Sequence, residues 1–209
     1  MRRVLGAIVL AVCASTAHAN LIANPSNESP LVGGGIAGWT EVVGSNWTQR
    51  FSNPDPFDGA AYFFAGAGAN GTLRQVVDVS SFAATIDAST QVFEFAGRVR
   101  SFNQSNPDSS RIVVTYLAGN ASALATFDSG EITDTVSWQL VTDSRVAPNF
   151  TRSIQIDLVA TRNFGTNNDG YFDALSLVAA PVPEPSGYVL MALGLTLVAS
   201  RVRARSKVR

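Results

Sequence analysis

The residues that could carry chemistry in this sequence are mainly carboxylates. It has sixteen Asp and Glu residues but one cysteine, Cys13, and one histidine, His18, and its only lysine is Lys207. All three lie near the two ends, outside the region expected to fold. That region therefore offers no thiolate nucleophile, no imidazole base and no Cys/His zinc site. Carboxylates, tyrosines, hydroxyls and arginines remain for catalysis.

Glycoside hydrolysis is the reaction that carboxylates alone could support. Retaining enzymes need two carboxylates about 5 Å apart, and inverting enzymes need about 6.5–9.5 Å. Sixteen acidic residues in a small domain give such pairs by chance, and no stretch pairs an acid with a convincing cleft. We therefore predict a protein that is not an enzyme, and we keep a carboxylate-based glycoside hydrolase as an alternative.

Residues 1–19 have the pattern of a cleavable signal peptide. Two arginines precede an apolar run over 4–12, and residues 17–19 read Ala-His-Ala, an A-x-A cleavage site. Cleavage there makes Asn20 the first mature residue and removes the cysteine and the histidine. Lipid attachment at Cys13 is an alternative, but Val12 is larger than the residue that a lipobox places before its cysteine.

Residues 181–209 combine three features in a fixed order. A Val-Pro-Glu-Pro-Ser motif at 182–186 precedes an uncharged apolar stretch at 187–200, which we predict to be a transmembrane helix, and a basic tail at 201–209. The prolines disfavour helix at the motif. The apolar stretch is shorter than the roughly 20 residues of a full crossing, a deficit that snorkelling arginine stems can cover. The basic tail would stay on the cytoplasmic side.

This arrangement resembles the PEP-CTERM sorting signal of Gram-negative bacteria. The resemblance implies recognition by a membrane-embedded exosortase-type transpeptidase, with transient insertion of the C-terminal helix in the inner membrane. Secretion machinery would then deliver the mature form to the cell surface, outer envelope or extracellular matrix. A single-span anchor with a stop-transfer charge cluster is the alternative. The motif residues are Val182, Pro183, Glu184, Pro185 and Ser186, and the membrane-flanking basic residues are Arg201, Arg203, Arg205, Lys207 and Arg209.

Charge narrows the range of partners. Two of the fifteen basic residues lie in the signal peptide and five in the basic tail, which leaves eight against sixteen acidic residues between positions 20 and 185. A net charge of about −8 argues against nucleic acid or anionic lipid as a partner. Such a charge is typical of a soluble secreted domain and is compatible with the binding of divalent cations.

Residues 20–180 are predicted to fold as one all-β domain. Short β-rich runs recur between turn clusters, and no helical period is sustained. Each run has an apolar face that only another sheet can bury, so the pattern predicts a two-sheet antiparallel jelly-roll sandwich. The expected strands are 39–43, 47–51, 61–65, 73–79, 91–101, 111–117, 123–127, 137–142, 151–161 and 174–179, with 21–23 as an additional opening strand. In the 91–101 strand one face carries Val92, Glu94, Ala96, Arg98 and Arg100, and the other carries Phe93, Phe95, Gly97 and Val99.

Residues 20–28 and the Gly-Trp pair at 38–39 resemble the opening of galactose-binding-like jelly rolls, and 169–177 resembles their closing strand. Many carbohydrate-binding modules have this fold. The resemblance implies that the first and last strands lie side by side and bring Glu28 and Asp173 together. Calcium prefers hard oxygen ligands, so we predict a structural calcium site there, near Asn24, Asn168 or Asp169. The alternative is that Asp173 accepts backbone N–H groups.

An exposed aromatic ring beside polar groups is the usual platform for a sugar. Trp47, with Arg50 close by in sequence, is the ring that we expect at the surface, whereas Trp39 and Phe95 are assigned to the core. Other available rings are Tyr62, Tyr116, Trp138 and Tyr171. We therefore predict an exported, non-catalytic surface or matrix protein that interacts with extracellular polysaccharide. A structural surface component without a small ligand is the alternative.

Overall fold

The structure, a computed structural model, describes residues 19–44, 46–181 and 194. The predicted signal peptide, except its last residue, lies outside the described residues, and so does the sorting signal from 182 onward, except Gly194. Nowhere in the described part does a helix combine the length and the apolar character that a membrane crossing requires.

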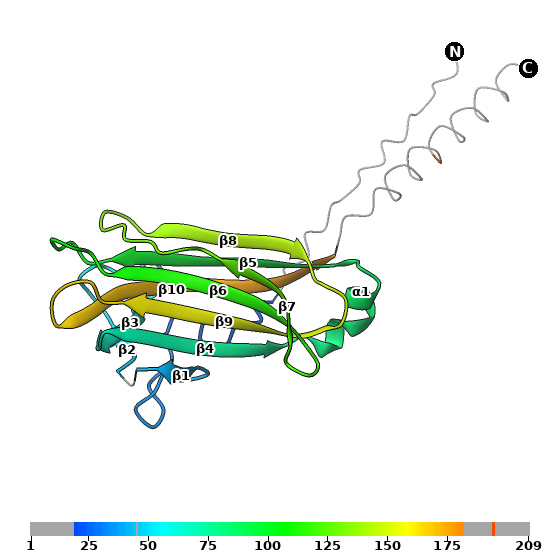
Figure 1. Cartoon of the computed structure of the whole chain (residues 1–209), viewed down its shortest axis with the longest axis horizontal. Helices are drawn as coiled ribbons and strands as arrows, with labels where there is room; N and C mark the ends of the chain where they lie inside the picture. The colour runs from blue at the N-terminus through cyan, green and yellow to red at the C-terminus, as the bar shows by residue number, and fades with distance from the viewer. Residues whose placement is uncertain (1–18, 45, 182–193, 195–209) are drawn as a thin grey trace, which may run out of the picture.

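Two five-stranded antiparallel sheets pack face to face in the described part of the chain (Figure 1). The first sheet contains, in spatial order, β1 (Thr40–Val43), β4 (Asn70–Asp78), β9 (Thr151–Thr161), β6 (Ser109–Ala118) and β7 (Ala123–Asp128). The second sheet contains β2 (Thr48–Arg50), β3 (Tyr62–Ala67), β10 (Asn167–Pro181), β5 (Gln91–Ser101) and β8 (Gln139–Val146). A short 3-10 turn, η1 (Ser80–Phe82), and one short helix, α1 (Ala83–Asp87), link β4 to β5. The predicted all-β sandwich is confirmed.

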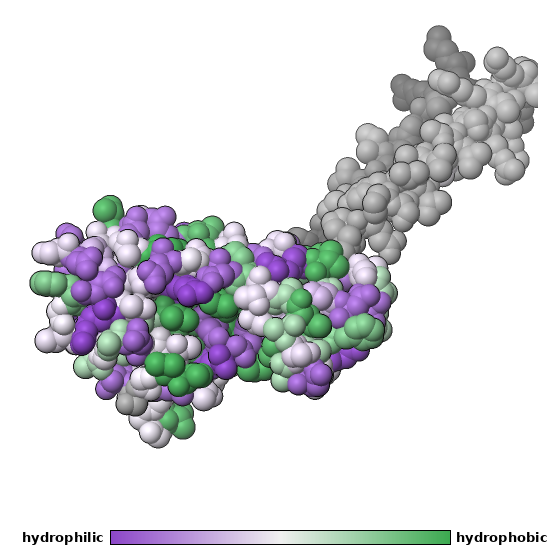
Figure 2. Space-filling view, viewed as in Figure 1, coloured by the Kyte–Doolittle hydropathy of each residue, from purple (hydrophilic) through white to green (hydrophobic). Residues whose placement is uncertain are grey.

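The core lies between the sheets and follows the predicted alternation. In β5, Phe93, Phe95 and Val99 are buried against the opposite sheet, while Glu94 is exposed and Arg98 half-buried on the outer face. Trp39 and Phe95 belong to this core, as expected. On the side of the molecule seen in Figure 2, hydrophilic residues alternate with small apolar areas.

Residues 21–23 form no strand, so the expected opening strand is wrong. One backbone hydrogen bond, from Leu21 N to Leu177 O, joins this segment to β10. The side chain of Asn20 supplies two more, donating to Leu175 O and accepting from Leu177 N. The opening segment therefore lies beside the closing strand as predicted, but a side chain replaces part of the strand ladder.

The closing strand β10 begins seven residues before the predicted 174–179 and lies in the middle of the second sheet, between β3 and β5. Its register with β5 shifts between Asp173 and Ser176, where Ala174 has a φ of 47°. A β-bulge changes which alternate residues face outward. Asp173 is paired with Arg98 and Ser176 with Ala96, so both place their side chains on the outer face.

Candidate functional site on the outer face of the second sheet

A shallow hollow of about 250 Å³ lies on the outer face of the second sheet, across β10, β5 and β8. Its floor is the row formed by Ser176, Ala96 and Thr142, which pair across the three strands. The next row, formed by Val178, Glu94 and Ser144, lines it as well. Small side chains leave the hollow open, and the residues that line it include three with hydroxyls and two acidic ones, Glu94 and Asp143. We refer to it as the trough.

Phe57 contacts Arg98, the outward residue of β5 that follows Ala96 of the trough, and presents an aromatic ring to solvent. The Arg98 guanidinium lies 4.2 Å from the centroid of this ring, on the outer face of β5. Cation–π contact of this kind holds a ring flat against the guanidinium. The Phe57 side chain is nevertheless 49% exposed. One ring surface is therefore fixed by the protein while much of the rest remains free for a ligand.

The loop that carries Phe57 is tied down at several points. Asp173 Oδ2 accepts the backbone N–H groups of Phe57 at 2.7 Å and Asp58 at 3.0 Å. The indole N–H of Trp138 donates to Asp55 O at 3.1 Å, and the Tyr62 hydroxyl donates to Ser52 O at 3.0 Å. Anchoring of this kind preorganises a binding loop, because less entropy is lost on binding.

The ring predicted as the sugar platform, Trp47, is not at the surface. It is 1% exposed and packs in the core against Phe172, with ring centroids 6.0 Å apart. The reason is register: Thr48 and Arg50 pair with the outward residues of β3, so the residue before them faces inward. The expectation of a surface Trp47 is wrong, and its indole nitrogen has no hydrogen-bond partner among the described residues.

Arg50 does lie on the outer face, but its guanidinium is already paired with groups of the protein. Its Nη1 donates to Asp169 Oδ1 at 3.1 Å and to the Tyr171 hydroxyl at 3.2 Å. Its guanidinium also lies 4.7 Å from the centroid of the Phe64 ring. This arrangement joins β2, β3 and β10, so Arg50 has a stabilising role in the sheet.

The tyrosines named as available rings are buried. Tyr62 and Tyr171 pack edge to face, with centroids 5.1 Å apart, beneath Trp138 and Arg50, and Tyr116 lies in the core. Burial raises the pKa of each tyrosine above its ordinary value, so their hydroxyls remain neutral. Trp138 is partly exposed and acts as a brace for the loop.

The carboxylates of the predicted calcium site hold backbone N–H groups. Glu28 Oε1 accepts from Ala60 N at 2.9 Å and Ala61 N at 2.8 Å. Asp173 uses Oδ2 for the Phe57 loop and Oδ1 for Ala174 N at 2.7 Å. Both acids thus grip residues 57–61, as the alternative interpretation of Asp173 expected. The described residues contain no group of three acids, histidines or cysteines that could hold a metal. The donor set as it stands does not fit calcium.

The buried position of Asp173 affects its ionisation. Burial, with a smaller contribution from the nearby Asp58 carboxylate, raises the pKa of this carboxyl to about 6, and three backbone N–H donors oppose the rise. A carboxyl of this kind titrates within the mildly acidic range.

One feature of the site, the position of Phe57, was missed in the sequence. Phe57 lies in a Pro- and Asp-rich segment that reads only as a loop, and its partner Arg98 is forty-one positions away. The alternation in 91–101 did place Arg98, Ala96 and Glu94 on one face. No local signal, however, indicated that Phe57 covers that face.

No protein-family model matches the chain, and no curated protein matches it by sequence. Solved structures do show its fold. A carbohydrate-binding module, TmCBM61, solved with β-1,4-galactotriose, has a TM-score of 0.53 at 15% identity over 78% of this chain and 99% of the module. A cyclase from Fischerella sp. TAU has a TM-score of 0.55 at 14% identity over 80% of this chain and 100% of the cyclase.

A third similar structure is longer than this chain. The enzymatically active domain of bacteriophage CBA120 tailspike protein 4 has a TM-score of 0.52 at 14% identity over 78% of this chain, but the match spans only 21% of that chain. Because identities are this low and the neighbours include enzymes and a binding module, the likeness establishes the β-sandwich and nothing finer.

Proposed function

We propose that this protein is a non-catalytic polysaccharide-binding protein that holds a neutral glycan in the trough. The observation that carries the proposal is the Phe57 ring, fixed on one side by Arg98 and exposed beside a trough lined by hydroxyls. An aromatic ring offers a large apolar contact at low entropic cost. Thr142, Ser144, Ser176 and Glu94 supply the few polar groups that fix orientation in a binding site.

The size of the trough favours a short segment of a chain over an enclosed small molecule. Its volume of about 250 Å³ is slightly below the ~300 Å³ at which typical small-molecule pockets begin. The trough also follows β5, along which successive outward side chains are about 7 Å apart. An extended glycan can run along such a strand and make several weak contacts. The similarity to a module solved with β-1,4-galactotriose supports this choice.

We also propose that the protein is exported and sorted. The sequence pattern at 1–19 supports a signal peptide, and 181–209 supports a PEP-CTERM signal processed by an exosortase-type transpeptidase. The mature form would then reside at the cell surface, outer envelope or extracellular matrix, where polysaccharide is abundant. The intact mass of the protein recovered from its native surface tests both cleavage points. An uncleaved mass would reject processing at either end.

Filling the trough provides the test of binding. The full chain would be screened by affinity electrophoresis against β-1,4-galactan and other neutral polysaccharides. A polysaccharide that binds the protein slows its migration in the gel. Ala96→Leu adds bulk at the trough floor and is expected to abolish this retardation. Ala123→Leu makes the same change at an exposed position in β7 of the other sheet and should leave retardation intact. Loss in both variants, or retardation by no polysaccharide, would leave the structural-component alternative standing.

Catalysis is tested separately. Turnover of chromogenic glycosides by the full chain would replace the non-catalytic proposal with the glycosidase alternative.

A further inference from the structure

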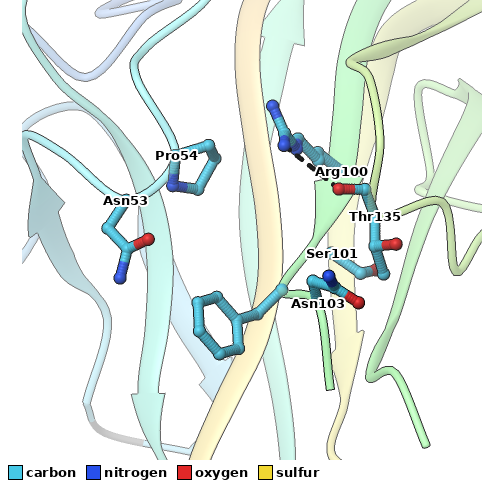
Figure 3. Close-up of a pocket in the computed structure, with 7 residues that line it drawn as sticks. Asn53, Pro54, Arg100, Ser101, Asn103 and Thr135 are labelled. Carbon is cyan, nitrogen blue, oxygen red and sulfur yellow. Dashed lines mark hydrogen bonds between the residues drawn. The ribbon is translucent and has the colours of Figure 1, made fainter. Parts of the chain in front are cut away.

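A second, smaller pocket lies at the other end of the outward face of β5. The described residues that line it are Asn53, Pro54, Arg100, Ser101, Phe102, Asn103 and Thr135. They come from the loop between β2 and β3, the end of β5 and the segment before β8. Figure 3 shows Asn53 and Pro54 on one side of the pocket, facing Arg100, Thr135, Ser101 and Asn103 on the other. The trough lies toward Glu94, and the Phe57 contact with Arg98 stands between the two.

Arg100 is the only ionisable residue among those that line the pocket. Its Nη2 donates to Thr135 O at 3.1 Å (Figure 3). Its Nε is enclosed by protein atoms and has no hydrogen-bond partner in the described part of the chain, so a ligand in the pocket would reach the guanidinium through its Nη groups. An unpaired buried donor on a charged group is costly and is rare in folded proteins. The planar guanidinium is built to bind a carboxylate through two parallel hydrogen bonds.

We propose that this pocket binds the carboxylate of an acidic sugar, a hexuronate. The pocket has a volume of about 90 Å³, roughly that of three liquid water molecules. This space admits a carboxylate group but not a whole pyranose ring, so the ring lies at the mouth. There Pro54 and Phe102 offer apolar surface, and the Asn53 and Asn103 amides offer hydrogen bonds to ring hydroxyls. These groups distinguish a sugar acid from a free carboxylate.

This inference does not rest on the proposed function, because the two sites share no lining residue. The trough is lined by hydroxyl residues and two acidic residues, which suit neutral sugar, whereas the Arg100 pocket has a cation and two amides. Long-range electrostatics oppose the approach of an anion, since the domain is acidic overall. Recognition therefore depends on short-range contacts with Arg100.

The test is an NMR titration of the isotope-labelled full chain with three probes: D-galacturonate, D-galactose and acetate. We expect galacturonate to shift the Nε–H signal of Arg100 and the amides of Phe102 and Asn103 in a saturable way. Galactose should leave these signals unchanged. Acetate should bind about tenfold more weakly than galacturonate, because it lacks the ring. Equal shifts with acetate would identify a general carboxylate site and overturn the sugar assignment.

Two variants keep the outcome interpretable. Arg100→Gln removes the guanidinium, with its parallel N–H donors and its charge, and should weaken galacturonate binding at least about tenfold. Asn103→Ala, on an exposed loop residue, should weaken it without disturbing the fold. The control is Arg162→Gln, which removes the same charge from an arginine that likewise donates to one backbone carbonyl, Thr166 O. Unchanged galacturonate binding in folded Arg100→Gln and Asn103→Ala proteins would overturn the proposal.

The two proposals can fail separately. Galacturonate binding that depends on Arg100, in a protein that binds no neutral polysaccharide, would support this inference and reject the trough. Retardation by neutral polysaccharide, with no galacturonate-induced shift of the Arg100 signal, would support the trough and reject this inference.

Discussion

The carboxylate of Asp173 accepts a 2.7 Å hydrogen bond from the backbone N–H of Phe57. The buried acid belongs to β10, in the middle of the second sheet, and the aromatic residue belongs to an exposed loop. The position of the Phe57 ring over Arg98 is therefore set from beneath by Asp173. Stability and binding at this face are linked through that contact, and substitutions on its two sides should separate them.

Removing the Phe57 ring should weaken glycan binding and leave the fold intact. Aromatic contacts in complexes contribute about 0.5–1.5 kcal/mol beyond area burial, so Phe57→Ala should reduce affinity for a retarding polysaccharide about tenfold. Phe164→Ala is the matched control, because this ring is 53% exposed and its backbone N–H is likewise held by a buried aspartate, Asp108. Affinity electrophoresis compares the two, and equal effects would argue against a specific platform.

Truncating Trp47 should unfold the protein more easily without a specific effect on binding. The ring is buried among Phe172, Ala65 and Gly71, and large-to-small changes at such sites cost about 3–5 kcal/mol. Urea unfolding measures the loss, with the partly exposed Trp138→Ala expected to cost less. A stable Trp47→Ala protein that had lost glycan binding would restore the surface interpretation of Trp47.

The stability of the domain should depend on pH through Asp173. Its folded-state pKa of about 6 lies above the ordinary 3.8, so the folded state binds the proton more tightly. The contribution of this group, on the order of 3 kcal/mol, is therefore fully present below about pH 4 and is lost as pH rises through 6.

Asp173→Asn is the variant that checks this pH dependence. The amide oxygen can still accept the N–H groups of Phe57 and Asp58, but the side chain no longer titrates. Urea unfolding of wild type and variant between pH 4 and 7 should give a difference in stability that changes with pH. Asp58→Asn removes the neighbouring charge that raises the Asp173 pKa, and should shift the pH dependence of stability to lower pH. A difference between wild type and Asp173→Asn that stays flat with pH contradicts the prediction.

Gly59→Ala should disrupt the hydrogen bonds by which Glu28 holds the loop. Gly59 has a φ of +63°, and an added Cβ would meet the Glu28 carboxylate, with its Cδ at 2.6 Å. Both the backbone strain and the clash oppose folding, so we expect a loss of more than about 1 kcal/mol. Gly130→Ala is the control, since Gly130 has a φ of +69° but open space around its Cβ position. The difference between the two variants in thermal unfolding isolates the contact with Glu28.

Calcium is expected to leave the melting temperature of the full chain unchanged. Glu28 Oε1 and both Asp173 oxygens accept backbone N–H groups, and a cation would have to displace those donors. Differential scanning calorimetry of a metal-stripped sample, with and without millimolar calcium chloride, checks this. A rise that disappears in Glu28→Gln would show that the loop rearranges to admit the ion, and would reinstate the predicted site.

Parts of the site could be predicted because they depend on local periodicity. The alternation in 91–101 separates Glu94, Ala96 and Arg98 from the inward Phe93 and Phe95 whatever the neighbours are. By contrast, the loop from 53 to 61 has no period, and its conformation is set by Asp173, Glu28 and Trp138 from distant positions. Trp47 was misplaced for a related reason, since β2, the strand that follows it, has three residues and is too short to reveal which side faces the core.

The sequence by itself determined an acidic all-β domain whose strands alternate apolar and polar residues, because a period of two allows burial only between sheets. Only the tertiary structure decided which outward residues meet. The bulge at Ala174 turns Asp173 and Ser176 to the same side. Packing of segments more than forty positions apart brings Phe57 to Arg98 and places Pro54 across a pocket from Arg100. Which side chains come close together depends on strand order and register. Long-range packing fixes both, and local sequence does not.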